Sequence, residues 1–263
     1  MSDTINVLSE IGYRGIEILC DVPHAYPKTQ SGPEISEIKQ LLSKLRISVS
    51  NLNAFTLFAI GDTYHPSWIE GDPSLRKLRI NHTIDCIKLA RKLGSKNIST
   101  EPGGPITNNE LSRVESLKVF EDGINQVLKT AEEESVTVLV EPEPGLLIEN
   151  SEQFVRFIKN FDTESIGLNL DIGHFFCVGE DPSQVIHKLS EYIHHVHLED
   201  ISADRQHNHL ILGEGAIDIS SALRSLKDVG YEGYVTVELY PYQDCPAYAA
   251  KQAMKFIKSL DYL

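Results

Sequence analysis

Residues 166–200 read IGLNLDIGHFFCVGEDPSQVIHKLSEYIHHVHLED, and this stretch decides the fold class. It holds two short strand-like runs, at 166–170 and 193–199, with a helical pattern between them that starts at Pro182. A mostly apolar run bounded by Gly and polar residues is typical of a strand buried on both faces. Such strands belong to parallel sheets with helices outside. The stretch therefore predicts a strand–helix–strand unit of an α/β fold.

The same alternation extends along the whole chain. Its 263 residues fit an eight-unit α/β barrel, which typically has about 250. We therefore expect an α/β fold, a TIM (β/α) barrel, with residues 1–263 in a single domain. The predicted strands span residues 15–19, 47–55, 97–103, 136–140, 166–170, 193–199 and 234–240. The predicted helices span residues 4–12, 34–45, 75–93, 117–134, 151–160, 182–191, 219–229 and 247–257.

The order of the first two elements is unusual for a TIM barrel. A helical pattern, TINVLSEIG at 4–12, precedes the first predicted strand, GIEIL at 15–19. Barrels of this type normally begin with a strand. We therefore expect a barrel that either lacks its first strand or closes with seven.

Composition limits the classes of partner. The hydrophobic content of 41% and the charged content of 24% are those of a globular protein. The net charge of −14 disfavours nucleic acid, because duplex binding relies on Lys and Arg to neutralise phosphates. The four cysteines have no CxxC spacing, the N-terminus lacks the features of a signal peptide, and no apolar run approaches the ~18 residues of a membrane helix. We expect a cytoplasmic protein without a membrane partner, and a homo-oligomer is compatible with this composition.

Four ligand-type side chains fall at corresponding places along the predicted strands. Glu141 follows VLV, Asp171 follows LNL, His197 follows HV, and Glu238 lies within YVTVELY. The carboxyl ends of parallel strands share one face of the sheet, so these side chains are expected to converge. A charge at the end of a buried run needs a partner, and three carboxylates with one imidazole favour a divalent metal ion. We expect Mn²⁺, with Mg²⁺, Co²⁺ and Zn²⁺ as alternatives.

Such a site indicates a class of chemistry. An oxygen-rich centre with open positions can bind two neighbouring substrate oxygens, polarise a carbonyl and stabilise an enediolate. Glu141 and Glu238 are the candidate catalytic residues, because one on each side of the substrate would permit stereochemical inversion. Three of the four ligands also have a structural alternative: Glu141 as a solvated loop acid, Asp171 as a helix cap, and His197 as a core histidine.

Five motifs in order resemble a known family. They are EPEPG at 141–145, LDIGH at 170–174, HVHLED at 195–200, HxHxxxGEGxID at 207–218, and VTVEL at 235–239. Together they resemble the sugar phosphate isomerase/epimerase group with the xylose isomerase-like TIM barrel. That superfamily also includes ketose 3-epimerases, inosose dehydratases and apurinic endonucleases of the endonuclease IV type.

The resemblance carries residue roles over motif by motif. It implies metal ligands at Glu141, Asp171, His197 and Glu238, with the first and last as the acid/base pair. It also implies that His174 and Arg205 hold substrate oxygens. In the endonucleases a corresponding loop pair binds additional zinc, and the pair here is His207 and His209. The early histidines of those nucleases have no evident match, so a nuclease is the poorer fit.

Three further residues are candidate substrate contacts. His209 lies in the loop after the sixth predicted strand, and Glu101 lies at a strand exit. Trp68 lies in a long loop, a kind of segment that often forms a lid or a binding surface. The sequence shows no GxGxxG or GxxxxGK[ST] motif, so we infer no nucleotide cofactor.

The sequence thus favours a metal-dependent isomerase or epimerase acting on a small carbohydrate, with or without a phosphate. The first alternative is a metal-dependent lyase or dehydratase acting on a keto-sugar or keto-inositol. A phosphodiester hydrolase comes next, and a non-enzymatic partner subunit with an inactive metal site is the last alternative.

Overall fold

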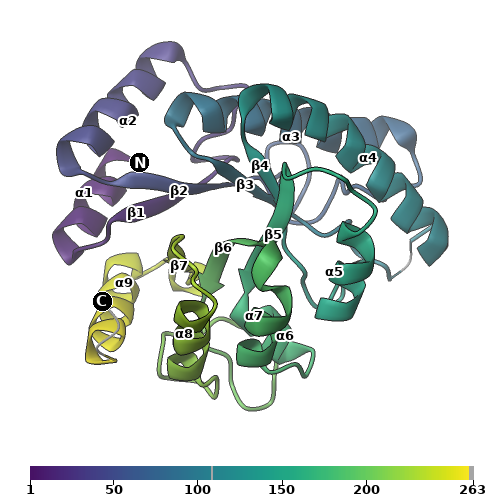
Figure 1. Ribbon diagram of the computed structural model, residues 1–263. Helices are drawn as coiled ribbons and strands as arrows, with labels where there is room; N and C mark the ends of the chain where they lie inside the picture. Colours follow the sequence, from purple (N-terminus) through teal and green to yellow (C-terminus); the bar gives the residue numbers. More distant parts are fainter. Residues whose placement is uncertain (108, 261–263) are drawn as a thin grey trace.

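The computed structural model describes residues 1–107 and 109–260. Seven strands in this part of the chain form one parallel sheet, in the order β1-β2-β3-β4-β5-β6-β7. The strands fill the middle of the molecule and the helices lie around them (Figure 1). This confirms the predicted α/β barrel architecture. The strands are β1 (Gly15–Leu19), β2 (Ser48–Asn53), β3 (Asn97–Thr100), β4 (Thr137–Val140), β5 (Ile166–Asp171), β6 (Ile193–Leu198) and β7 (Val235–Val237).

The helices cover the outside of the sheet, and several begin and end at the expected signals. Capping boxes start α2 at Ser31 and α4 at Ser112, and α1 ends at Gly12, whose φ is 110°. None of the helices in the described residues is both long and apolar enough to cross a membrane. The helices are α1 (Ser2–Ile11), α2 (Gly32–Leu45), α3 (Pro73–Leu93), α4 (Arg113–Glu134), α5 (Ser151–Ile158), α6 (Ile172–Cys177), α7 (Pro182–Leu189), α8 (Ile219–Asp228) and α9 (Pro246–Ser259), with short 3₁₀ turns η1 (Ser190–Tyr192) and η2 (Tyr240–Tyr242).

Three differences from the predicted elements bear on the site or its surroundings. The last strand ends at Val237, so Glu238 lies just beyond it. The short helix α6 follows β5 directly and is not among the predicted elements, because six residues carry too little periodicity. The helix α5 ends at Ile158, two residues before the end predicted at 160, and its start is capped by Asn150, whose side chain accepts a hydrogen bond from the backbone N–H of Gln153.

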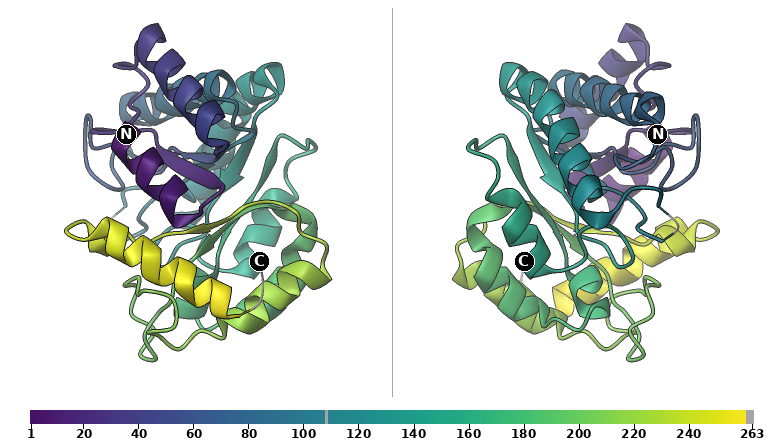
Figure 2. Two further views of the ribbon diagram at one scale, coloured as in Figure 1. Left: turned by 90° about the vertical axis from the view of Figure 1, so that its left-hand side faces the viewer. Right: turned by 90° about the vertical axis from the view of Figure 1, so that its right-hand side faces the viewer.

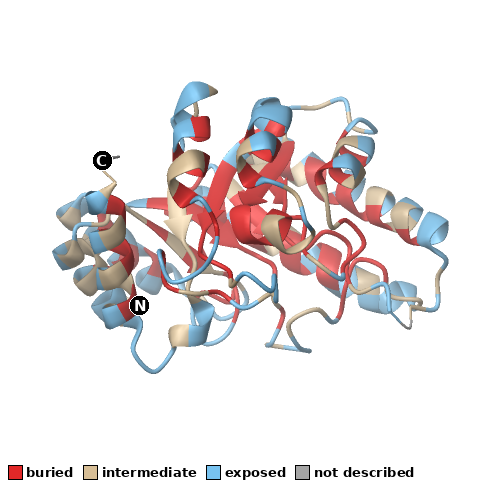
Figure 3. Ribbon diagram, turned by 90° about the horizontal axis from the view of Figure 1, so that it is seen from below, coloured by how far each residue is buried: buried red, intermediate tan, exposed pale blue. Residues whose placement is uncertain are grey.

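Burial differs strongly around the sheet. All six residues of β5 are buried, as the run at 166–170 predicts, whereas the three residues of β7 are only half-buried. Figure 3 shows the buried residues concentrated in the strands and on the helix faces turned towards them. Figure 2 shows α9 running beneath α1 on the side of the molecule where the two ends of the sheet lie. The core is therefore continuous around most of the barrel and thins between β7 and β1.

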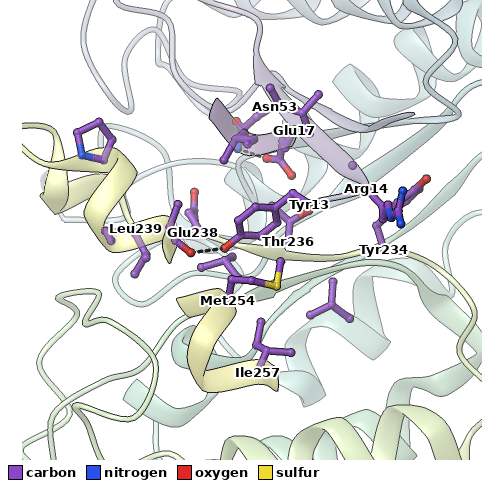
Figure 4. A pocket seen from close by; sticks show the side chains of 18 of the residues that line it. Tyr13, Arg14, Glu17, Asn53, Tyr234, Thr236, Glu238, Leu239, Met254 and Ile257 are labelled. Carbon is purple, nitrogen blue, oxygen red and sulfur yellow. Dashed lines mark hydrogen bonds between the residues drawn. The ribbon is translucent and has the colours of Figure 1, made fainter. Parts of the chain in front are cut away.

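The barrel remains open between its first and last strands. In the described residues β1 and β7 are the two ends of the sheet and form no ladder with each other. We call the gap between β1 and β7 the β1–β7 seam. A cavity of about 570 Å³ lies along it, with Tyr13, Tyr234 and Met254 among its lining residues (Figure 4). Seven strands therefore come close to closing the barrel without completing it.

Candidate metal centre

Four predicted ligands lie together at the carboxyl ends of the strands. One ligand atom from each of Glu141, Asp171, His197 and Glu238 lies within 4.8 Å of the others. The Nδ1 atom of His197 is 2.9 Å from Glu141 Oε1, 3.3 Å from Glu238 Oε2 and 3.8 Å from Asp171 Oδ2. Glu141 follows β4, Asp171 ends β5, His197 lies in β6 and Glu238 follows β7. The strand ends thus bring together four side chains that are far apart in sequence.

Local structure fixes one of the carboxylates. Asp171 caps α6, and its Oδ1 atom accepts a hydrogen bond of 2.8 Å from the backbone N–H of His174. Its other oxygen, Oδ2, is buried without a hydrogen-bond partner, and the same is true of Glu141 Oε2. A buried carboxylate oxygen without a donor is costly unless a cation or proton lies beside it. The donor set and these unpaired oxygens fit a divalent metal ion.

The electrostatics of the centre are dominated by burial and by His197. Burial acts to lower the pKa of His197, but Glu17, Glu141 and Glu238 raise it well above its usual value. Burial raises the pKa of Glu141, although His197 opposes this. Burial also acts to raise the pKa of Glu238, but His197 outweighs it and the pKa is lowered. Without a metal, the surrounding carboxylates thus favour the protonated form of His197.

Three histidines form a second group beside the four ligands. His174 is 3% exposed, and its Nδ1–H donates to the carbonyl oxygen of Pro142 at 2.9 Å. The rings of His207 and His209 lie 4.6 and 6.0 Å from that of His174, measured between centroids. His209 is itself buried and its Nδ1 lies 3.2 Å from the carbonyl oxygen of Glu238. His174 and His209 are therefore brought to the centre.

The loop that carries His207 and His209 is held at both ends by Asp200. The Asp200 carboxylate accepts hydrogen bonds from the backbone N–H groups of Ile201 and Ile217 on Oδ1 and of Gly213 and Gly215 on Oδ2. A side chain at Gly215 would meet Asp200 Oδ1 at 2.3 Å, so only glycine allows this close approach. The GEG motif is therefore part of the contact by which Asp200 holds the end of this loop.

Three predicted substrate contacts are placed elsewhere. Trp68 is 1% exposed, donates from Nε1 to Thr100 Oγ1 at 3.0 Å and packs against Phe120 in the hydrophobic core. A long loop can thus send an aromatic ring inward, and this structure does not bring the candidate substrate contact Trp68 to the four predicted ligands. Tyr64 of the same loop instead reaches Glu143: its hydroxyl donates to Glu143 Oε1 at 2.7 Å.

Glu101 and Arg205 are also engaged in internal contacts. Glu101 is 0% exposed and its Oε1 atom lies 3.3 Å from Nε of the equally buried Arg79. The Glu101 carboxylate is therefore enclosed beside Arg79, and a substrate contact by Glu101 stays a prediction. Arg205 is exposed, but its guanidinium lies 4.3 Å from the Phe176 ring centroid and donates to the Phe176 carbonyl oxygen. The structure does not bring Arg205 to the four ligands.

Several residues at the centre are absent from the predicted set. Glu17 of β1 accepts hydrogen bonds from two histidines of β6. Glu143 is buried, and burial raises its pKa to about 7. Glu199 is 0% exposed, and its carboxylate occupies the space that a side chain at Gly173 would take, 1.7 Å from the position of its Cβ. For Glu17 the sequence signal is the alternation in GIEIL, which turns one acid inward between two isoleucines.

Known proteins provide a comparison with this geometry. Fructoselysine 3-epimerase of Escherichia coli O157:H7 is 26% identical over 264 residues, which cover 96% of this chain and 90% of that enzyme. Inosose dehydratase of Clostridium beijerinckii is 27% identical over 165 residues, or 55% of this chain and 54% of that enzyme. The chain thus spans about half the length of that dehydratase, while the match to the epimerase is nearly complete.

A solved structure and a family profile agree on the fold. The crystal structure described as the IolI protein with a binding zinc atom superposes with a TM-score of 0.81 at 20% identity, covering 100% of this chain and 94% of that one. The sequence profile described as xylose isomerase-like TIM barrel matches residues 5–260. The resemblance seen in the five motifs is therefore confirmed over almost the whole chain. This chain belongs to the xylose isomerase-like TIM barrel family.

Proposed function

We propose that this protein is a divalent-metal-dependent isomerase or epimerase of small polyhydroxylated ketones. One observation carries the proposal: the carboxylates of Glu141 and Glu238 reach the same nitrogen of His197 from β4 and β7, which lie three positions apart in the sheet. Two carboxylates that approach one point from different strands can remove a proton from one face of a carbon acid and return a proton to the other.

The proposed ion is held by Glu141, Asp171, His197 and Glu238. When bound, a divalent cation supplies a Lewis acid that polarises the substrate carbonyl and neutralises charge on the neighbouring oxygens. The zinc atom in the IolI structure supports an ion of this class. A carboxylate-rich donor set also suits Mn²⁺, which we retain as the expected metal, with Mg²⁺, Co²⁺ and Zn²⁺ as alternatives.

The two glutamates have different proposed roles. Burial raises the pKa of Glu141, whereas His197 outweighs burial at Glu238 and lowers the pKa of that carboxyl group. Carboxyl groups whose surroundings push their pKa values apart are typical of an acid and a base that work together. Glu238 then takes the proton from the carbon next to the carbonyl, and Glu141 donates a proton to the opposite face. The roles exchange in the reverse direction.

The charge of the centre supports a carbohydrate without a phosphate group. In the described residues, every ion pair at the centre joins a carboxylate to a histidine, and none involves Lys or Arg. The guanidinium of Arg205 is occupied by Phe176. A phosphate would bring further negative charge to a region already rich in carboxylates, and charges that are poorly screened repel strongly. The carboxylates in question are Glu17, Glu141, Glu143, Asp171, Glu199 and Glu238.

A lyase acting on a keto-sugar or keto-inositol is the second candidate. It shares the first proton transfer and differs only in losing a hydroxyl group from the next carbon. The observation in its favour is the group of His174, His207 and His209 beside the ligands, which offers an additional proton donor for a leaving group. Similarity to inosose dehydratase supports the same alternative.

Solvent deuterium uptake tests the proposal. Purified protein with Mn²⁺ is incubated in D₂O with unphosphorylated ketoses, keto-inositols and their phosphates, and label at carbon is followed by NMR. We expect uptake without loss of water for an epimerase, and loss of a hydroxyl group for the lyase. Glu238→Gln and Glu141→Gln should abolish uptake, whereas Glu37→Gln, on the exposed face of α2, should retain it. Phosphodiester cleavage without any deuterium uptake would contradict the proposal.

A further inference from the structure

Glu17 lies on the strand farthest in sequence from the other residues of the centre. On β1 the flanking side chains Ile16 and Ile18 are buried in the hydrophobic core, and Glu17 alternates to the interior of the barrel. Its side chain is 11% exposed and lines the cavity at the β1–β7 seam (Figure 4). A carboxylate so placed needs hydrogen-bond donors.

Three donors satisfy Glu17, and two of them are histidines of β6. The Oε2 atom accepts hydrogen bonds from Nε2 of His197 at 2.8 Å and from Nε2 of His195 at 2.9 Å. The Oε1 atom accepts a hydrogen bond of 2.9 Å from Nδ2 of Asn53 (Figure 4). The Asn53 amide is itself oriented, because its Oδ1 accepts from the backbone N–H of Phe55 at 3.0 Å. Glu17 therefore has no free oxygen to reach the four ligands.

We infer that Glu17 is the positioning residue of His197: it fixes the proton of His197 on Nε2 and so presents Nδ1 as the metal ligand. The inference rests on the proposed metal centre. Nδ1 is the nitrogen that lies 2.9 Å from Glu141 and 3.3 Å from Glu238, on the far side of the ring from Glu17. A carboxylate that accepts the second N–H of a ligating imidazole fixes its tautomer and orientation and makes it a stronger ligand.

The shared hydrogen bond of His195 has a separate consequence. Two N–H donors on one carboxylate oxygen keep Glu17 satisfied without a Lys or Arg partner. His195 thus holds Glu17 in place through its Nε2–H, while Glu17 holds His197 in place. The arrangement joins β1 to β6 across a barrel in which β1 and β7 do not pair.

The same three groups could in principle hold a cation of their own, since atoms of Glu17, His195 and His197 lie within 4.8 Å of one another. The distances of 2.8 and 2.9 Å are those of ordinary N–H···O hydrogen bonds, so both Nε2 atoms carry protons. A cation there would bind Nε2 of His197 and leave the proton on Nδ1, so that Nδ1 could no longer serve as a ligand of the four-ligand centre. The geometry favours positioning over a separate site.

The first experiment measures zinc affinity by competition with a chelator in wild-type protein, Glu17→Gln, Glu17→Ala and the control Glu37→Gln. Loss of a supporting partner of a metal-bound histidine typically costs 10–100-fold in affinity. We expect a loss of about that size for both Glu17 variants and none for Glu37→Gln. Zinc affinities of the Glu17 variants within about twofold of wild type would overturn the inference.

The second experiment needs no variant and so does not depend on folding of a mutant. Long-range ¹H–¹⁵N NMR spectra of zinc-loaded wild-type protein report which nitrogen of His197 carries the proton. We expect a proton on Nε2 and the metal on Nδ1, and the reverse assignment would overturn the inference. Neither readout requires turnover: a normal zinc site with the expected tautomer but no deuterium uptake would sink the proposed function and leave the role of Glu17 intact. Wild-type protein that takes up neither Zn²⁺ nor any of Mn²⁺, Mg²⁺ and Co²⁺ would overturn both.

Discussion

The two halves of the barrel mouth are built differently. In the closed arc of β4, β5 and β6, the ligands Glu141, Asp171 and His197 have side chains that are 4%, 0% and 1% exposed. At the β1–β7 seam, the side chain of Glu238 is 29% exposed. Three ligands are therefore held by tight packing, and the fourth is attached to a short, half-buried strand at an open edge. In the proposed metal centre, the arc would define where the metal lies, and the seam would supply the most exposed of the four candidate ligands.

The largest expected effect comes from removing charge within the closed arc. Asp171→Asn keeps the oxygen that caps α6 but removes the negative charge facing His197. We expect metal affinity to fall by more than about 100-fold, beyond the 10–100-fold typical of supporting residues. Metal content after dialysis and chelator competition measure this. An affinity close to wild type would show that the arc does not define the metal position.

The matched change at the seam should weaken metal binding less and abolish proton transfer. For Glu238→Gln we expect about a tenfold loss of metal affinity, because Gln keeps one oxygen and the arc ligands remain. At saturating metal, deuterium uptake should fall by about 10²–10⁴-fold, the usual contribution of a general base. If Glu238→Gln lost metal as completely as Asp171→Asn, the contrast between arc and seam would be broken.

Protons should compete with the metal at the arc over an unusually high pH range. In the metal-free protein, burial opposes protonation of His197, but Glu17, Glu141 and Glu238 raise its pKa well above the usual value. A ligand must lose its proton before it binds metal, so affinity rises with pH until that raised pKa is passed. We expect up to about a tenfold change in affinity per pH unit below it. Titrations from pH 6 to pH 9 that showed no pH dependence would contradict this.

The smallest effects concern stability, and they compare two neighbouring positions in one ladder. Val196 of β6 is 0% exposed and is paired in register with the half-buried Val235 of β7. We expect Val196→Ala to lower the free energy of unfolding by about 2 kcal/mol and Val235→Ala by about 1 kcal/mol or less. Urea unfolding of the metal-free protein measures both. Equal losses would mean that the seam is packed as tightly as the arc.

Much of the scaffold could be predicted because its signals are local. Gly15–Leu19 is an alternating run that ends where the structure ends the strand, and the run at 166–170 is uniformly buried because it lies under helices. Convergence of the four candidate ligands followed from a general property of parallel strands, whose carboxyl ends meet on one face. Position along a strand was enough to find these residues.

The remaining site residues depended on information that the local sequence does not contain. Trp68 and Glu101 lie in segments that approach the mouth, yet their side chains point into the core, towards Thr100 and Arg79. A loop's length and a strand's end do not specify that direction. Glu17 was not predicted, because its partner His197 lies 180 residues later in the chain. Only the closed geometry of the barrel makes them neighbours.

Asp200 holds both ends of the loop that carries His207 and His209, and this bears on how the substrate preference of such an enzyme could change. The Asp200 carboxylate accepts hydrogen bonds from both ends of the loop that carries His207 and His209. Residues in a loop whose two ends are fixed can be substituted with little effect on the strands and helices beneath it. Substitutions in this loop alone could therefore change which sugar the protein prefers, while the residues at the strand ends keep the same chemistry.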